Sequence, residues 1–374
     1  MKQDQKEKGI SENIAGRLLS WYDEHKRILP WRENRHPYRI WISEIMLQQT
    51  RVEAVKPYYD RFLEALPGIS DLAAAREQEL LKLWEGLGYY NRVRNLQKAA
   101  VMIMEEYNGE MPEEYELLLR LPGIGEYTAG AIASIAFSKP VPAVDGNVMR
   151  ILARVLGDDS DISDGKLKKE YAALLGGIMP KDRPGDFNQA LMELGATVCI
   201  PTGAPKCEEC PIHKDCAACR EGLTGQLPYK KKAKERAIEK KTVLLIRDGD
   251  HVVIQKRPAG GLLAGMYEYP MFEGWLSRKQ ALTIVKEMGY DPMDIRPSAQ
   301  GVHIFTHKEW HMHSYFVKIA DTVPEKTAKK GPGRKPFLIR PEQIDAEYPV
   351  PSAYRIFRQE IDHFTKHKRS LPHS

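Results

Sequence analysis

Leu121–Gly130 has the sequence LPGIGEYTAG, in which a Leu-Pro-Gly-Ile-Gly turn leads directly into an Ala- and Ile-rich helix. Gly123 and Gly125 have no side chains, so they leave backbone amides uncovered beside the N-terminus of that helix. Free amides and the helix dipole both favour an anion such as a phosphate. We interpret the turn as the centre of a helical hairpin that contacts a phosphate; the alternative is an ordinary turn that needs glycine for a positive φ angle.

The hairpin lies within a long helical region. Apolar residues recur at helical spacing from about residue 11 to residue 196, which predicts an all-helical domain at residues 1–220. Residues 221–240 are polar and basic without an apolar period, and this composition is typical of a linker.

A different pattern begins at residue 241. TVLLIR and HVVIQKR flank an Asp-Gly turn, which predicts a β-hairpin, and SRKQALTIVKEMG predicts a helix that ends at a glycine. GVHIF and HMHSYFVKIA alternate between apolar and polar residues as two further strands do. Residues 241–366 are therefore predicted to form a small α+β domain.

Composition restricts the class of protein. The chain has 374 residues, of which 42% are hydrophobic, so it can bury a core in each of two domains. No apolar run approaches the roughly 20 residues of a membrane-spanning helix, and the N-terminus lacks the apolar core of a signal peptide. We expect a cytoplasmic protein that does not enter a membrane. A net charge of +5 permits nucleic-acid binding without requiring it.

All five cysteines lie between Cys199 and Cys219. Cys199, Cys207, Cys210 and Cys216 have the spacing C-x7-C-x2-C-x5-C, which indicates a metal site more than a set of disulfides in a reducing compartment. Four thiolates suit either a [4Fe-4S] cluster or a structural zinc ion. Cys219 is then an extra thiol.

Two acidic residues have the surroundings expected of catalytic groups. Glu44 lies on the apolar stripe of IWISEIMLQQT, and burial would raise its pKa towards the range of a general acid. The alternative is an ion pair with an arginine such as Arg32, Arg39 or Arg51. Asp145, in VDGN, precedes a helical run, where an Asp also serves as an N-cap.

The order of these motifs resembles the helix-hairpin-helix superfamily of DNA glycosylases typified by endonuclease III. Within it, LPWRENRHPYRIWISEIMLQQTRVEAVKPYY is similar to the N-terminal signature of the MutY-type adenine glycosylases, and the resemblance covers the whole chain. It implies a [4Fe-4S] cluster, with one residue more than the usual C-x6-C at the first spacing. It also implies a C-terminal domain like the Nudix fold.

The resemblance also implies roles for individual residues. Glu44 would protonate adenine at N7, and Asp145 would stabilise the cationic sugar, with Tyr127 and Asn147 arranging the site. A lysine stands at the position of Tyr127 in relatives that also cut the strand, so the resemblance implies a monofunctional enzyme. Contacts to the extruded base and the DNA are implied for Trp31, Arg32, Gln48, Gln49, Tyr89 and Gln189.

The second domain is implied to recognise 8-oxoguanine. A Phe-Ser-His element of the family corresponds here to Phe305, Thr306 and His307, with threonine in place of serine. The helix of this domain keeps only Glu287 of the acidic residues that a working Nudix hydrolase needs. We therefore expect a binding module.

We thus expect a monomer that acts on double-stranded DNA containing adenine opposite 8-oxoguanine or guanine. Two alternatives remain open. One is a related glycosylase that acts on thymine or uracil mismatches, and the other is a non-catalytic iron-sulfur protein that binds DNA.

Overall fold

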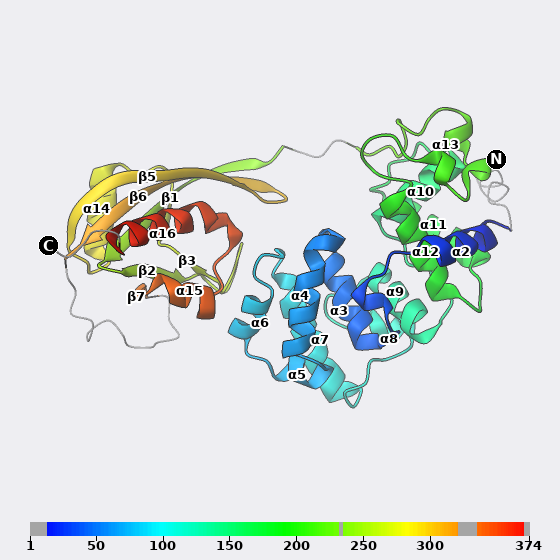
Figure 1. Cartoon of the computed structure of the whole chain (residues 1–374), viewed down its shortest axis with the longest axis horizontal. Coiled ribbons are helices and arrows are strands. Elements are labelled where there is room, and N and C mark those ends of the chain that lie inside the picture. The colour runs from blue at the N-terminus through cyan, green and yellow to red at the C-terminus, as the bar shows by residue number, and fades with distance from the viewer. Residues whose placement is uncertain (1–12, 232–234, 321–334, 370–374) are drawn as a thin grey trace. The chain divides into compact units, whose positions relative to one another are not determined.

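The computed structural model describes residues 13–231, 235–320 and 335–369. The chain divides into two compact units (Figure 1). The first contains residues 1–75 and 94–233, and the second contains residues 76–93 and 234–374. In the described ranges, no helix is both long enough and apolar enough to cross a bilayer.

The first unit is helical. Helix α7 begins in residues 76–93 of the second unit and continues into the first. The α-helices and 3-10 turns, α7 included, are α2 Ile14–His25, η1 Pro30–Arg32, α3 Pro37–Leu47, α4 Val52–Ala65, α5 Ile69–Ala74, α7 Asn91–Glu106, α8 Tyr115–Leu118, α9 Glu126–Phe137, α10 Gly146–Leu156, α11 Gly165–Ile178, α12 Pro184–Thr197, η2 Cys207–Glu209, η3 His213–Asp215 and α13 Ala217–Arg220.

Helix α10 connects the core of this unit to the sites described below. Its buried residues Val148, Ile151, Leu152 and Val155 follow helical spacing, and they pack in one cluster with side chains of α2, α11 and α12. The helix ends at Gly157, whose φ of 64° is the left-handed conformation common after helix C-termini. One end of α10 therefore carries Asp145 as its N-cap, while its body supports the cysteine-containing segment.

The predicted hairpin is formed by α8 and α9. Gly123 has a φ of 81°, and a Cβ atom there would lie 2.7 Å from the Cβ atom of Asn95. Gly125 is the N-cap of α9, and open space surrounds the position of its missing side chain. Gly130 lets α9 approach the chain before Asp145, because a Cβ atom there would lie 2.4 Å from the carbonyl oxygen of Pro142.

The second unit contains a mixed sheet between helices. Its elements are α6 Glu77–Leu83, β1 Ala237–Asp248, β2 His251–Lys256, β3 Tyr267–Glu268, β4 Met271–Glu273, α14 Arg278–Glu287, β5 Pro292–Ile304, β6 Lys308–Ile319, β7 Phe337–Ile339, α15 Pro341–Glu347, η5 Ser352–Tyr354 and α16 Arg355–Arg369.

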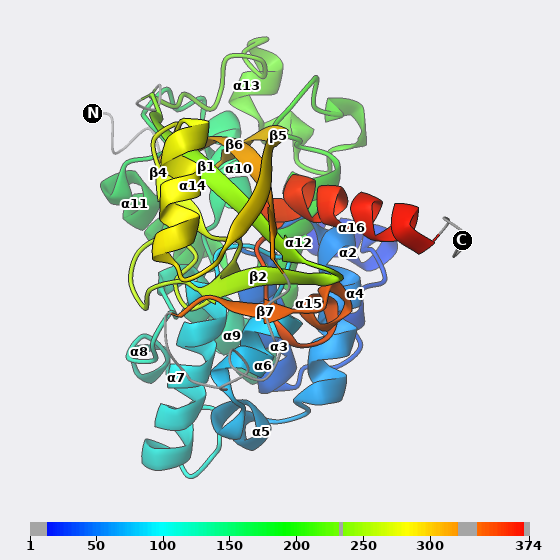
Figure 2. The ribbon, with the colours of Figure 1, turned by 90° about the vertical axis from the view of Figure 1, so that its left-hand side faces the viewer.

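The strand order is β3-β2-β1-β6-β5, with β4 paired to β1 and β7 paired to β2. Strands β1 and β6 are parallel, and the other pairs are antiparallel. Figure 2 shows α14 and α16 on opposite sides of the sheet. Ala281 and Val285 of α14 pack on one face, and Phe357 and Ile361 of α16 pack on the other.

Several boundaries differ from the pattern in the sequence. Strand β1 begins at Ala237, inside the segment interpreted as a linker. Leu227, from the start of that segment, is buried in the core of the first unit. Residues 232–234 lie outside the described ranges. Strands β3, β4 and β7 are too short to show an alternation of apolar and polar residues, so the sequence pattern does not predict them.

Candidate active site and cysteine pocket

One pocket in the first unit collects all four predicted catalytic residues. Helices α3, α9, α10 and α12 and the turns beside them form its walls. The predicted residues that line it are Trp31, Arg32, Glu44, Gln48, Gln49, Gly125, Tyr127, Asp145, Asn147 and Gln189. Its other lining residues include Arg27, Lys168, Met192 and Glu193, which the sequence analysis did not select.

Glu44 lies on α3 and is only 6% exposed. Burial raises its pKa to about 7, and the charge of Asp145 adds to the rise, while the Tyr127 hydrogen bond and Arg32 act in the opposite direction. Glu44 is therefore partly protonated near neutral pH, as a general acid requires. Its hydrogen-bonding partner is Tyr127, while Arg32, one of the arginines considered as a partner, is paired with Glu193.

Tyr127 is the second residue of α9, directly after the glycine turn. Its hydroxyl donates to Oε2 of Glu44 at 2.6 Å. Burial and the neighbouring carboxylates, Glu44 first, raise the pKa of Tyr127 well above its ordinary value, so the phenol remains a proton-bearing donor. The turn thus places a hydrogen-bond donor at the carboxyl group of Glu44.

Asp145 caps α10 and is held from two sides. Its Oδ1 accepts from the amide of Val148 at 2.8 Å, and its Oδ2 accepts from Nδ2 of Asn147 at 2.7 Å. Burial raises the pKa of Asp145, and these hydrogen bonds oppose the rise. The N-cap function and a place in the pocket therefore coexist at this residue.

Arg150 orients the side chain of Asn147 through a hydrogen bond. Its Nη2 donates to Oδ1 of Asn147 and to the carbonyl of Gly195, each at 2.8 Å, and its Nε donates to the carbonyl of Cys199 at 2.8 Å. Because the amide oxygen of Asn147 accepts from Arg150, the amide nitrogen is directed to Asp145. A network of hydrogen bonds thus runs from the pocket to the first cysteine of the cysteine-containing segment.

Glu193 is the second buried carboxylate of the pocket. It is completely buried, and its two oxygens pair with Nε of Arg27 at 2.6 Å and Nη2 of Arg32 at 2.7 Å. Burial alone would raise the pKa of Glu193, but the two arginines outweigh it and lower the pKa. An acidic residue among apolar ones in ALMELG was the signal in the sequence, the same kind of signal as at Glu44.

The remaining predicted base contacts occupy different positions around the pocket. Trp31 is nearly buried and packs edge-to-face on Tyr59, with ring centroids 5.4 Å apart. Gln48 is the C-cap of α3, and its Nε2 donates to Oγ1 of Thr128 at 3.3 Å. Gln189 lies on α12, half-buried. Gln49 is exposed and has a φ of 57°, a left-handed conformation that is uncommon for a residue with a side chain.

The other predicted DNA contacts lie outside this pocket. Gly123 belongs to the hairpin of the first unit. Tyr89 and Thr306 are both in the second unit, where the Tyr89 hydroxyl and Oγ1 of Thr306 are 3.0 Å apart. Phe305 packs edge-to-face on Trp310, while His307 is exposed in the turn between β5 and β6. The structure therefore brings two of the predicted lesion contacts together.

Tyr89 has a constrained backbone. Its φ of 48° is left-handed, and the preceding Gly88 also has a positive φ, of 72°. Nη2 of Arg92 donates to the carbonyls of Leu87 at 2.9 Å and Gly88 at 3.0 Å. The guanidinium group of Arg92 also lies 5.6 Å from the Tyr89 ring centroid. Arg92 thus helps hold Tyr89 in this uncommon conformation.

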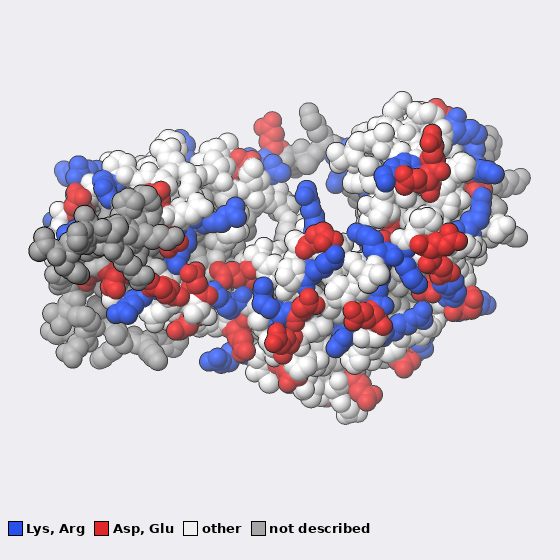
Figure 3. Space-filling view, in the orientation of Figure 1, with Lys and Arg blue, Asp and Glu red and all other residues white. Residues whose placement is uncertain are grey.

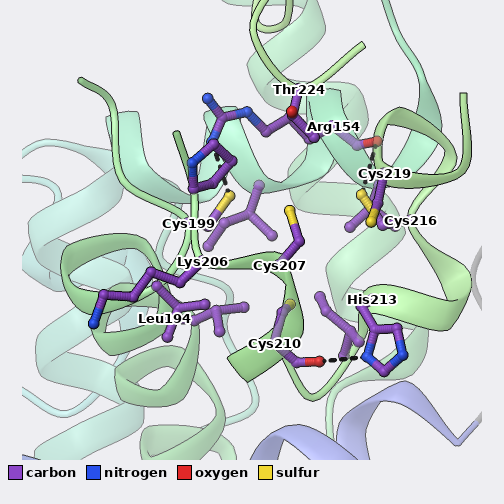
Figure 4. A pocket seen from close by; sticks show the side chains of 15 residues that line it. Arg154, Leu194, Cys199, Lys206, Cys207, Cys210, His213, Cys216, Cys219 and Thr224 are labelled. Carbon is purple, nitrogen blue, oxygen red and sulfur yellow. Dashed lines mark hydrogen bonds between the residues drawn. The ribbon is translucent and has the colours of Figure 1, made fainter. Parts of the chain in front are cut away.

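The five cysteines line a second pocket of the first unit, beside α10 and α12 (Figure 4). Nη1 of Arg154 lies 3.2 Å from Sγ of Cys199. Cys210 is partly buried beside the other thiols, and desolvation first and then their charges raise its pKa to about 12. In the described residues, no three His, Cys, Asp or Glu side chains are grouped closely enough to hold a single metal ion.

Comparison with known proteins identifies both halves. Residues 42–176 match the HhH-GPD superfamily of base excision DNA repair proteins, and residues 242–360 match the NUDIX domain. Adenine DNA glycosylases from Mus musculus and Homo sapiens are each 36% identical to the chain, over 84% and 85% of its length and 72% and 69% of theirs. The adenine DNA glycosylase of Buchnera aphidicola from Acyrthosiphon pisum is 33% identical over 81% of the chain and 85% of its own length.

The chain belongs to the adenine DNA glycosylases. This adenine DNA glycosylase combines the helical fold of base excision repair enzymes with a Nudix-like domain. A solved thermostable thymine-DNA glycosylase is also similar, with a TM-score of 0.51 and 30% identity, but it covers 59% of this chain and 100% of its own. Family membership confirms the predicted enzyme class and argues against a non-catalytic DNA-binding protein.

Proposed function

We propose that this chain hydrolyses the N-glycosidic bond of adenine mispaired with 8-oxoguanine or guanine in double-stranded DNA. The observation that carries the proposal is the buried Glu44, which has a pKa of about 7, accepts from Tyr127 and shares its pocket with Asp145. The names of the relatives support adenine as the base.

The first step requires a proton donor. An adenine inside a duplex must leave the stack before its glycosidic bond can be reached. Because Oε2 of Glu44 accepts from Tyr127, the transferable proton resides on Oε1 and passes to N7 of the base. The bond between N9 and C1′ then breaks, and its electron pair leaves with the protonated adenine.

The second step concerns the sugar cation left at C1′. The carboxylate of Asp145, oriented by Val148 and Asn147, provides a fixed negative charge for this cation. A water molecule adds to C1′ and loses a proton, so the products are free adenine and an abasic site. Trp31, Arg32 and Gln189 line the pocket in which the base would be held.

Recognition of the lesion opposite adenine is assigned to residues outside the pocket. Thr306 and Tyr89, 3.0 Å apart through their hydroxyls, form a polar contact beside the exposed turn of the second unit. The left-handed backbones of Tyr89 and Gln49 are the kind of local strain that accumulates at functional sites. We infer that both side chains enter the duplex, and that Thr306 contacts 8-oxoguanine.

Local groups of the helical unit can contact the DNA backbone. Figure 3 shows Lys and Arg side chains interspersed with Asp and Glu on the face that it presents. Contacts to the DNA backbone would then come from local groups, including the amides at Gly123 and Gly125 beside α9.

A [4Fe-4S] cluster is the cofactor that the cysteine pocket suits. Cys199, Cys207, Cys210 and Cys216 would hold it, because all four line one pocket and thiolates are the ligands of such clusters. Nη1 of Arg154 lies 3.2 Å from Sγ of Cys199 and places a positively charged side chain beside that ligand position. The thiols line different sides of the pocket instead of converging on one point. This arrangement suits a cluster of several atoms better than a single zinc ion. When bound, the cluster would stabilise the cysteine-containing segment, which Arg150 links to Asn147 through the carbonyl of Cys199.

Base release from a panel of duplexes tests the proposed substrate. Purified protein should release adenine opposite 8-oxoguanine fastest, adenine opposite guanine more slowly, and no thymine opposite guanine. Thr306→Ala should reduce the preference for 8-oxoguanine over guanine, while Thr306→Ser, which keeps the hydroxyl, should preserve it. Release of thymine, or an unchanged preference in Thr306→Ala, would reject the corresponding part of the proposal.

Borohydride trapping tests the proposed hydrolysis by water. Tyr127 cannot form an imine, so the protein should leave an intact abasic site and yield little covalent complex. Lys168 is the lysine that lines the pocket, and Lys168→Ala is the matched control. Efficient trapping that disappears in Lys168→Ala would show that an amine, not water, is the nucleophile.

A further inference from the structure

The extra thiol, Cys219, shares a helix face with one of the four cysteines assigned to the cluster. Cys216 is the N-cap of α13, and Cys219 is the third residue of that helix. Positions three apart lie on one side of a helix, so both thiols are directed into the same pocket. Figure 4 shows both side chains among those that line this pocket.

Cys219 is also a direct neighbour of Cys207. Both side chains line the cysteine pocket. The two side chains are hydrogen-bonded to each other. Cys219 thus lies within the group of thiols and contacts Cys207.

Cys207 is the cysteine that follows the irregular spacing. The loop CIPTGAPKC brings it into the pocket, and Gly203 in this loop has a φ of 80° with open space around its missing side chain. By contrast, Cys199 is contacted by Nη1 of Arg154, and Sγ of Cys216 donates to the carbonyl of Arg154 at 3.4 Å. Cys207 therefore enters from a loop that carries one residue more than the usual spacing.

We propose that Cys207 and Cys219 are interchangeable as the fourth thiolate ligand, with Cys199, Cys210 and Cys216 as the fixed three. This inference rests on the proposed iron-sulfur cluster. In the exchange, the thiol of Cys219 would lose its proton and take the ligand position that Cys207 leaves, and the Cys207 thiolate would take up a proton. No electron is transferred, so no oxidant or reductant is needed.

The experiment measures iron and acid-labile sulfide per chain, with the visible absorption spectrum, in the full-length protein purified without oxygen. Wild type, Cys207→Ser and Cys219→Ser should each contain about four irons, because either thiol completes the set. The double variant Cys207→Ser/Cys219→Ser should lose most of its iron. Cys210→Ser is the matched control and should lose iron as a single variant.

Alkylation of the native protein, mapped by mass spectrometry, provides a second measurement. Wild type should have one reactive thiol, at Cys207 or Cys219, and iron-loaded Cys207→Ser should have none. Loss of iron from Cys207→Ser alone, retention of iron in the double variant, or a reactive Cys219 in iron-loaded Cys207→Ser would overturn the exchange. Wild type without iron would instead reject the cluster itself, so the two failures are distinguishable.

Discussion

Glu44 and Glu193 are two buried glutamates of one pocket, and their environments differ. Glu44 has a phenol as its partner, and its pKa rises to about 7. Glu193 has two arginines as partners, and its pKa falls below the ordinary value. Both are glutamates among apolar residues of a helix. Burial alone therefore does not make a general acid, because the charge of the partner determines which form of the carboxyl group is stable.

The largest expected effect is on catalysis at Glu44. Glu44→Gln keeps the shape of the side chain but removes the proton donor, so single-turnover adenine release should fall by about two to four orders of magnitude. Binding of the mispaired duplex should remain near wild type. If the variant retains substantial activity, the acid is another residue, and the proposed difference between the two glutamates is wrong.

Glu193→Gln should affect stability more than chemistry. It leaves the guanidinium groups of Arg27 and Arg32 without their shared carboxylate, and breaking a buried pair costs about 3 kcal/mol. Chemical denaturation measures the loss, with Glu44→Gln as the control near pH 5, where Glu44 is mostly protonated and that variant breaks no ion pair. Equal stability of wild type and Glu193→Gln would show that the arginine pairing contributes little.

The pH dependence of stability should have opposite signs at the two residues. The pKa of Glu44 is raised on folding, so its contribution becomes less favourable as pH rises from about 4 to about 7, by up to about 3 kcal/mol. Relative to wild type, Glu44→Gln should thus gain stability over this range. The pKa of Glu193 is lowered, so its contribution is present above the ordinary glutamate value and is lost as pH falls below it. Unfolding measured from about pH 3 to about pH 8 tests both signs, with Glu193 at the acidic end and Glu44 between about pH 4 and pH 7.

Tyr127→Phe should produce the smallest of these effects. The Tyr127 hydroxyl lowers the pKa of Glu44, so its removal should raise that pKa above about 7 and move the alkaline limb of the adenine-release profile to higher pH. Tyr171→Phe is the matched control, because Tyr171 donates to Asp158 at 3.1 Å outside the pocket. An unshifted limb in Tyr127→Phe would mean that the hydroxyl does not tune Glu44.

Several local features of the site were predictable because they depend on short-range patterns. The hairpin glycines, the cysteine spacing and the N-cap at Asp145 are short-range features. The structure places the glycines between α8 and α9, the cysteines beside α10, and Asp145 at the start of α10. The helical character of the first unit also follows from periodicity that the sequence displays directly. The family resemblance added the roles of individual residues.

Other parts depend on which segments meet. Glu193 was not selected, although it lies in a pattern like that of Glu44, because its arginine partners are more than 150 positions away in the sequence. The contact between Tyr89 and Thr306 joins residues 217 positions apart. Such pairs have no local signature.

The sequence by itself determined where titratable and metal-binding groups occur along the chain, since residue type and spacing are local properties. It did not determine their protonation. Only the tertiary structure decided that Glu44 faces Tyr127 while Glu193 faces Arg27 and Arg32. The physical reason is that a pKa depends on desolvation and on neighbouring charges, and both are produced by the packing of helices distant in sequence.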